Sequence, residues 1–253
     1  MTKNKVGKYL LYAIGEIILV VIGILIAVSI NNGNEDRKAR KLEVKYLKNL
    51  QMDIAQEQQN NDNLLNHRTI TAKAAAHMLN FKTLETVSDL VDLEQTIEKV
   101  FSSVNFIPTN NTYKELLSSG NLNYITNDSI KSHLLELDKT YVAISSYEHH
   151  MYREYEEYLY NVTVRNGEAL NLLDFQEMAE TGSPAFKDPS LIRIETVIPD
   201  YNRLLEKTIF INGLKLAVIS NSGLRLVHSR MIDQLQKLSE LILKDLNTDG
   251  NDD

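Results

Sequence analysis

Apolar residues form one long run near the start of the chain. Residues 9–30, YLLYAIGEIILVVIGILIAVSI, contain a single charged side chain, Glu16. A helix of these 22 residues is about 33 Å long and can cross the roughly 30 Å hydrocarbon core of a bilayer. Tyr9 and Tyr12 lie where amphipathic rings favour the headgroups. The run predicts a transmembrane helix. The alternative is a signal peptide that is cleaved at a small-x-small site at 27–29. The apolar run is longer than that of an ordinary signal peptide.

A helical pattern of a different kind follows the apolar run. Leu42, Tyr46, Leu50 and Ile54 recur every four residues, which predicts a long helix over about 34–81 that leaves the membrane. Its middle, AQEQQNNDN at 55–63, has no apolar face. Three interpretations of this part stay open: a solvated stalk, a frayed stretch, or a surface packed through polar contacts.

Three further helical segments are predicted downstream, over 88–102, about 127–164 and about 200–246. Between the first two, a short helix is expected to begin with a capping box of Thr112 and Glu115 and to close at Gly120. The stripe of the second segment consists of Leu134, Leu137, Tyr141, Ile144, Met151, Tyr155, Tyr158 and Val162. Heptad-like spacing in the third involves Leu224, Val227, Met231, Leu235, Leu238 and Ile242. Gly213 and Gly223 are expected at kinks or close contacts.

These elements predict an all-α protein in which one N-terminal transmembrane helix precedes an elongated antiparallel helical bundle. The predicted parts are a cytoplasmic tail at 1–8, the transmembrane helix at 9–30, a helical soluble domain at 31–246 and an acidic tail at 247–253. The chain has only 4 Pro and 10 Gly among 253 residues, which favours long regular elements over the turn-rich pattern of β-sandwiches.

The charge balance narrows the choice of partners. Residues 31–253 carry 24 basic and 33 acidic side chains, a net charge of −9. Nucleic acid is therefore not expected as a partner, because binding to phosphates requires a concentrated basic face. The chain contains no Cys, which excludes disulfides, thiolate metal sites and a cysteine nucleophile.

Positive charges flank the predicted span on both sides. It is preceded by Lys3, Lys5 and Lys8 and followed by Arg37, Lys38, Arg40, Lys41 and Lys45. Their count alone is ambiguous, but the short basic tail and the ease with which long domains translocate favour an N-terminus inside. We therefore expect a single-pass protein of the inner (cytoplasmic) membrane, with its soluble domain in the periplasm.

Glu16 lies about two turns into the predicted span, where a charge is costly. Its carboxyl either snorkels or is buried in its neutral form, or pairs with another helix, or takes part in a proton path. Gly23 and Ala27 form a small-xxx-small pair that permits close packing of helices. We predict a helix–helix contact in the membrane that includes Glu16, Gly23 and Ala27, in a homo-oligomer or with another membrane protein.

Two stretches resemble a known family. GKYLLYAIGEIILVVIGILIAVSINN at 7–32 is similar to the N-terminal signature of a Bacteroidota family of single-span membrane proteins of unknown function. TYKELLSSGNLNYITNDSIKSHLLEL at 112–137 resembles the internal block of that family, with a Ser-Gly turn between two helices. The resemblance implies an N-in, C-out topology and a helical soluble domain, and it implies no catalytic residues.

Clusters of reactive side chains are few. His150 and Glu154, beside Glu148 and His149, are one helical turn apart and could share a metal ion, but a zinc site requires three or four ligands. Residues 245–250, DLNTDG, copy the first half of a calcium-binding loop and lack its last carboxylate. No nucleotide-binding, zinc-protease or serine-hydrolase motif occurs. We predict no metal, cofactor or catalytic residue.

One apolar span, long helices and missing catalytic motifs indicate a non-enzymatic, membrane-anchored helical interaction or scaffold protein. The alternative is an extracytoplasmic ligand-sensing domain. Because eight residues precede the span, such a sensor would signal through a partner membrane protein. An enzyme whose residues converge only in the folded chain is the third class.

Overall fold

A computed structural model describes residues 3–166, 173–183, 185 and 187–248. The described chain is all-α, as predicted. Its long helices are α1 (Lys3–Met78), α4 (Asp128–Tyr155) and α8 (Thr208–Thr248). The shorter elements are α2 (Val87–Phe101), α3 (Asn111–Ser118), the 3₁₀ turn η1 (Asn121–Tyr124), the π-turn η2 (Glu156–Tyr160), α5 (Asn161–Val164), α6 (Phe175–Thr181), the 3₁₀ turn η3 (Pro189–Leu191) and α7 (Ile194–Glu206).

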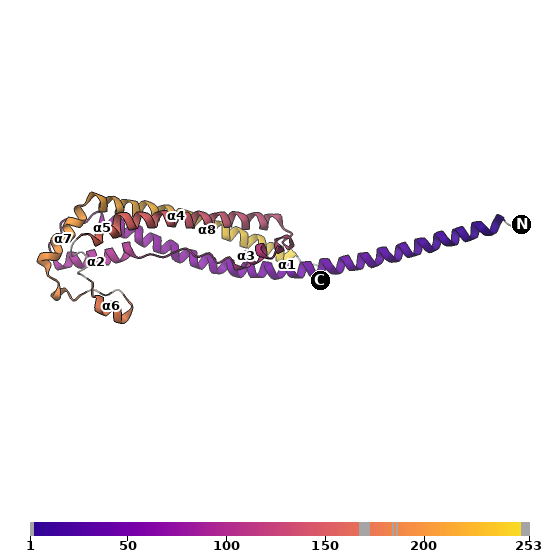
Figure 1. Cartoon of the computed structure of the whole chain (residues 1–253), viewed down its shortest axis with the longest axis horizontal. Helices are drawn as coiled ribbons and strands as arrows, with labels where there is room; N and C mark the ends of the chain where they lie inside the picture. The colour runs from indigo at the N-terminus through magenta and orange to yellow at the C-terminus, as the bar shows by residue number, and fades with distance from the viewer. Residues whose placement is uncertain (1–2, 167–172, 184, 186, 249–253) are drawn as a thin grey trace.

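The helix α1 joins the two segments predicted at 9–30 and 34–81 into one. It contains 76 residues and is about 114 Å long at the usual rise of 1.5 Å per residue. Its N-terminal part projects from the bundle as a free rod, and its C-terminal half forms one side of the bundle (Figure 1). The helix continues without a break through Gly33.

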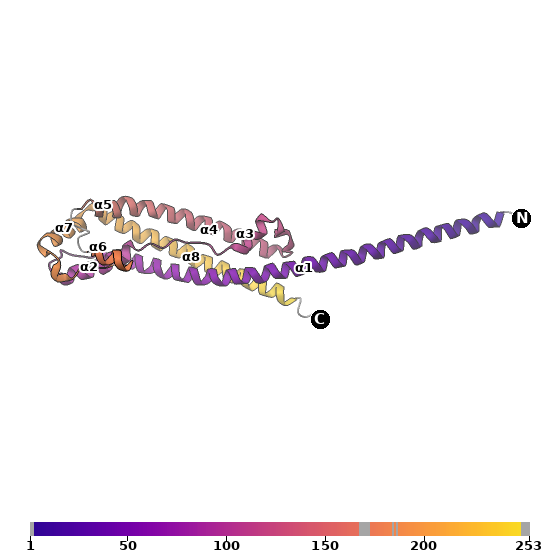
Figure 2. The ribbon, with the colours of Figure 1, turned by 60° about the horizontal axis from the view of Figure 1, so that its bottom comes forward.

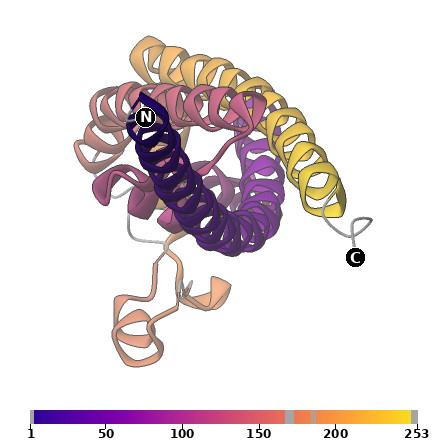
Figure 3. The same ribbon diagram turned by 90° about the vertical axis from the view of Figure 1, so that its right-hand side faces the viewer.

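The bundle has four legs that alternate in direction (Figure 1 and Figure 2). The helix α1 forms the first leg. The chain returns through α2, an extended segment at 102–110 and α3, which together form the second leg. The third leg, α4, runs parallel to α1, and α8 runs back against both. Away from this core, α6 protrudes from the side of the bundle (Figure 3).

Buried positions on the three long helices are spaced alternately three and four residues apart, which is the heptad spacing of coiled coils. On α1 they are Glu43, Leu47, Leu50, Ile54, Glu57, Asn61, Leu64, Arg68, Thr71, Ala75 and Met78, and Tyr46, Ala72 and Ala74 beside this stripe are buried as well. On α4 they are Ile130, Leu134, Leu137, Tyr141, Ile144, Glu148, Met151 and Tyr155. On α8 they are Phe210, Leu214, Ala217, Asn221, Leu224, His228, Met231, Leu235, Leu238 and Ile242. The predicted stripes are confirmed apart from Leu42, Tyr158, Val162 and Val227, which are only partly buried, and polar residues are added to each stripe.

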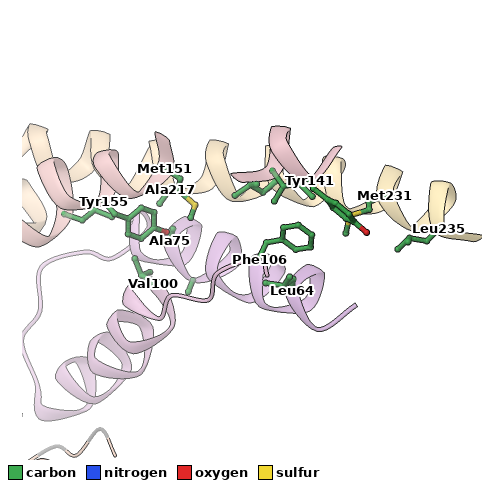
Figure 4. Packing of buried hydrophobic residues seen from close by; sticks show 14 of the residues in the cluster. Leu64, Ala75, Val100, Phe106, Tyr141, Met151, Tyr155, Ala217, Met231 and Leu235 are labelled. Carbon is green, nitrogen blue, oxygen red and sulfur yellow. The ribbon is translucent and has the colours of Figure 1, made fainter. Parts of the chain in front are cut away.

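The extended segment contributes to the same core although it is not helical. Phe106 points inward between Leu64 of α1 and Tyr141 of α4 (Figure 4). Its ring centroid lies 5.5 Å from that of Tyr141. The segment thus takes the place of a helix in the second leg.

The predicted capping box at Thr112 and Glu115 is wrong. The helix α3 follows Asn110, and the amide of Thr112 donates to Oδ2 of Asp53 at 2.8 Å. An acceptor from α1 has replaced the local cap. A capping box occurs instead at the start of α2, between Thr86 and Asp89. The predicted closure of α3 by glycine is confirmed, because Gly120 has a φ of +70° directly after the helix.

The segment predicted over about 200–246 is two helices. The helix α7 ends at Glu206, and Lys207, with ψ of 120°, turns the chain into α8. No Gly or Pro lies at this break, so the pattern gave no local signal for it. Gly213 lies at a close contact as predicted, since an added Cβ would be 2.9 Å from the backbone oxygen of Tyr158. Gly223 has open space around it.

Candidate functional site

The residues predicted to form a contact in the membrane lie on one side of α1. A helix turns about 100° per residue, so Gly23 and Ala27 project within about 20° of the direction of Glu16. All three are exposed, and no described part of the chain covers the side chains from 9 to 30. By length and composition, this stretch of α1 can cross a membrane. The structure brings the three residues onto one face, and the contact itself stays a prediction.

A second group of candidates lies in the bundle core. Eight polar side chains occupy heptad positions there, each less than a tenth exposed: Glu43, Glu57, Asn61, Arg68 and Thr71 of α1, Glu148 of α4, and Asn221 and His228 of α8. Polar groups in such positions cost free energy unless they are paired. Their partners therefore explain why the core is built this way.

The extended segment 102–110 accounts for two of these carboxylates. Only its end residues, Ser102 and Asn110, form helical backbone hydrogen bonds, with the flanking helices. The buried amides between them need other acceptors. Glu148 accepts the amide of Phe106 through both oxygens at 3.1 Å, and Glu57 accepts the amide of Thr109. Carboxylates from α1 and α4 thus replace the hydrogen bonds that a helical second leg would have formed within itself.

Arg68 and Glu148 form an ion pair in the interior, with 2.5 Å between Nη2 and Oε1. Arg68 is 2% exposed, and its Nη2 also donates to the carbonyl of Val104 at 2.8 Å. Burial raises the pKa of Glu148, although the Phe106 amide and the charge of Arg68 act in the opposite direction. The pair fastens α1, α4 and the extended segment to one another.

Asn61 and His228 join α1 to α8. The amide nitrogen of Asn61 donates to the carbonyl of His228 at 2.9 Å, which turns its oxygen towards Nδ1 of the ring at 2.5 Å. Nδ1 therefore carries the proton of a neutral imidazole. Burial, together with the charge of Arg68, lowers the pKa of His228 to about 4. The ring is uncharged at pH 7.

Several atoms of this polar core have no partner among the described residues, including Oε1 of Glu57, Nε of Arg68 and Nε2 of His228. Burial raises the pKa of Glu57, and the negative charge of nearby Asp53 adds to the increase. The hydrogen bond from Thr109 acts in the opposite direction. A cavity of about 20 Å³ is bordered by α1, α3, α4 and α8, with Asp53 and Thr109 among its lining residues. That volume suits one water molecule and is too small for an organic ligand.

An open groove lies outside the core, between α1 and the extended segment, with a volume of about 490 Å³. The amides of Asn63 and Asn66 line one side, and Ile107, which is 77% exposed, lines the other. The groove exists because an extended chain is narrower than the helix whose place it takes. Its neutral amides and apolar side chains suit an uncharged ligand.

The cluster predicted around His150 is divided between core and surface. Glu148 points inward to Arg68, whereas His149 and His150 are exposed. Nε2 of His150 lies 3.5 Å from Oε1 of Glu154, whose other oxygen accepts the hydroxyl of Ser220 at 2.6 Å. Within the described residues, no three His, Asp or Glu side chains are arranged to hold a metal ion.

The end of the bundle nearest the apolar part of α1 has its own polar cluster. Arg40 bridges Glu43 at 2.5 Å and Asp245 of α8 at 2.9 Å. Glu43 also accepts the amide of Thr126 at 2.6 Å. Asp245 was the first residue of the calcium-loop resemblance, and here its carboxylate faces Arg40 and Asn127. The rest of that resemblance, at 249–250, lies outside the described residues.

The buried polar core was not predicted from the sequence, although the spacing of its residues on α1 indicated it. Glu57, Asn61 and Arg68 continue the alternating three- and four-residue steps that begin in the apolar stripe of α1. Extending that register through the polar stretch 55–63 would have placed the first two of them in the core. Of the three interpretations given for 55–63, the structure supports packing through polar contacts. No comparable spacing pattern indicated the extended segment 102–110.

Fold and site together define a class of protein: an all-α chain in which one apolar helix continues into a bundle with a polar, heptad-spaced core. Within that class, the chain belongs to a family described as Family of unknown function (DUF6090), which matches residues 16–198. The match begins at Glu16 and ends within α7, so it includes the extended segment and six of the eight polar residues at buried heptad positions. No curated protein and no solved structure matches the chain.

Proposed function

We propose that this chain is a non-enzymatic, membrane-anchored interaction or scaffold protein. The observation that carries the proposal is the continuity of α1, since the helix that can cross a membrane also forms the first leg of the bundle. From Ile30 to the first buried heptad position, Glu43, is 13 residues, or about 20 Å of helix. The bundle is thereby held at a short, fixed distance from the bilayer.

A rigid connection suits a protein that presents a surface to partners near the membrane. The Arg40 cluster supports this role, because it fastens α1 to α8 where α1 leaves the bundle. The apolar side chains at 9–30 also remain available for contact with the lipid bilayer and with other helices.

The proposed location is the inner membrane, with the N-terminus in the cytoplasm and the bundle in the periplasm. The short basic tail supports this orientation. Alkaline phosphatase fused after Asp253 is then expected to be active. A fusion of green fluorescent protein at the same position that fluoresces, with inactive phosphatase, would place the bundle in the cytoplasm.

The second candidate is a ligand-sensing domain that signals through a partner. The groove beside α1 favours it, because a ligand there would touch the helix that continues into the membrane. Titration calorimetry of the full chain in lipid nanodiscs, against metal ions and pools of small neutral molecules, separates the two. Tight stoichiometric binding that is lost in Asn63→Ala/Asn66→Ala would favour the sensor and contradict a pure scaffold.

A further inference from the structure

Glu16 is the one described residue between 9 and 30 with a charge, and nothing in the described chain meets it. Its side chain and its neighbours along the helix are exposed. A carboxyl at this depth needs a hydrogen-bond donor or a positive charge, because lipid tails offer neither. With one helix long and apolar enough to span a membrane in the described chain, a second membrane helix that supplies such a group belongs to another molecule.

The surface beside Glu16 is hollowed. Gly15 has no atoms within 4 Å of the position a Cβ would take. The hollow that results is bordered by Leu11, Tyr12 and Leu19. A long side chain entering it from a neighbouring helix would reach the carboxyl of Glu16 from the side.

Two turns further along, the same face carries the small residues Gly23 and Ala27. Small residues allow two helix backbones to approach closely. A partner helix that meets Glu16 can therefore stay in contact with α1 deeper in the membrane. The opposite face carries the branched apolar side chains of Ile14, Ile18, Val21 and Leu25 at the depth of these residues.

We propose that this face docks against a transmembrane helix of another membrane protein that carries a Lys or Arg at the depth of Glu16. The proposal rests on the proposed function, in which residues 9–30 cross the membrane. Charge complementarity favours such a partner over a second copy of the chain, because a parallel dimer would place two carboxyls at the same depth. The basic side chain occupies the hollow at Gly15 and pairs with Glu16.

The test uses the full chain, labelled with a fluorescent donor, in phosphatidylcholine vesicles. The probe is a synthetic Leu/Ala helix with one Lys at the depth of Glu16 and an acceptor label, and the matched probe has Leu in place of Lys. Energy transfer is expected to show roughly 3- to 30-fold tighter association with the Lys probe, the range expected for polar contacts between membrane helices. Glu16→Leu should remove this preference, and Glu16→Gln should retain part of it.

The matched control keeps the carboxyl and moves it to the other face. In Ile14→Glu/Glu16→Leu, the preference for the Lys probe should fall to that of Glu16→Leu. Equal binding of both probes by the wild type, or an unchanged preference in the double variant, would overturn the proposal. So would self-association of the chain that is lost in Glu16→Leu, since a second copy would then be the partner. Protease protection reports insertion separately, and a chain that fails to insert contradicts the proposed function itself.

Discussion

Arg68 is the only Lys or Arg among the described residues that is buried in the bundle, and its loss would leave Glu148 as an uncompensated buried charge. Arg68→Met keeps much of the aliphatic volume and removes the charge. We expect the free energy of unfolding to fall by about 3–5 kcal/mol, the usual cost of breaking a buried pair. Urea unfolding of the full chain in detergent micelles, followed by circular dichroism, measures the change.

The control for this prediction is Arg68→Met/Glu148→Gln. Glutamine removes the second charge and can still accept the amide of Phe106, so more than half of the lost stability should return. A loss below about 1 kcal/mol in the single variant would be typical of an exposed pair. That result would contradict the burial of the pair.

His228 makes the stability of the core depend on pH. Its pKa is lowered from 6.5 in the unfolded chain to about 4 in the bundle, so the unfolded state binds the proton more readily. The stabilisation is complete above pH 6.5 and is lost as the pH falls towards 4, by about 3 kcal/mol in total. The raised pKa values of Glu57 and Glu148 act in the opposite sense, since their stabilisation is lost as the pH rises.

The variant His228→Gln isolates the histidine, because the carboxylates remain unchanged. Its amide can still donate to Asn61, so the bundle should fold. Between pH 6.5 and 4 the unfolding free energy of the wild type should fall more steeply than that of the variant. Parallel curves over this range would show that His228 does not titrate on unfolding.

At the scale of the elements, α8 passes the π-turn η2 in close contact at Gly213. Tyr158 and Leu159 of the π-turn lie against Gly213, whose added Cβ would be 2.8 Å from Cδ2 of Leu159. Gly213→Ala should therefore destabilise the bundle by about 1–3 kcal/mol, the usual cost of overpacking. Gly223→Ala, in open space on the same helix, should instead stabilise it by up to about 1 kcal/mol. Thermal unfolding of both variants in micelles tests the contrast.

The buried faces of the helices could be predicted from the sequence where they consist of apolar residues. The stripes of α8 and α1 could be placed from spacing alone. Burial is confirmed for Leu224, Met231, Leu235, Leu238 and Ile242 and for Tyr46, Leu50 and Ile54, whereas Leu42 and Val227 are only partly buried. The break at Lys207 was not predictable, because tertiary packing rather than a Gly or Pro sets it. The candidate site in the core depends on contacts far apart in sequence, such as Arg68 with Glu148. Only the register of α1 pointed towards it.

In the whole molecule, the polar core fixes how the legs are aligned. Asn61 has its partner on α8, and Arg68 has its partner on α4. A shift of either helix by one heptad would separate these pairs while leaving most apolar contacts possible. Polar residues at coiled-coil core positions commonly specify register in this way, at some cost in stability. The bundle is thus a defined body at the end of α1 rather than a loosely packed one.

Whether that body is rigidly linked to the membrane depends on the stretch of α1 around Gly33. The chain has no Cys, so pairs of spin labels can be attached at single introduced cysteines. For Ile26→Cys/Lys48→Cys in nanodiscs, a continuous helix predicts a narrow distance distribution near 33 Å, given a rise of about 1.5 Å per residue. Insertion of Gly-Ser-Gly-Ser after Gly33 should broaden this distribution.

The control pair, Lys48→Cys/Lys73→Cys, lies within the bundle. Its distance distribution should stay narrow with and without the insertion, because the core begins at Glu43, after the insertion site. A broad distribution in the uninterrupted chain would mean that α1 bends freely at Gly33, and the bundle would then be tethered to the membrane rather than held at a fixed distance.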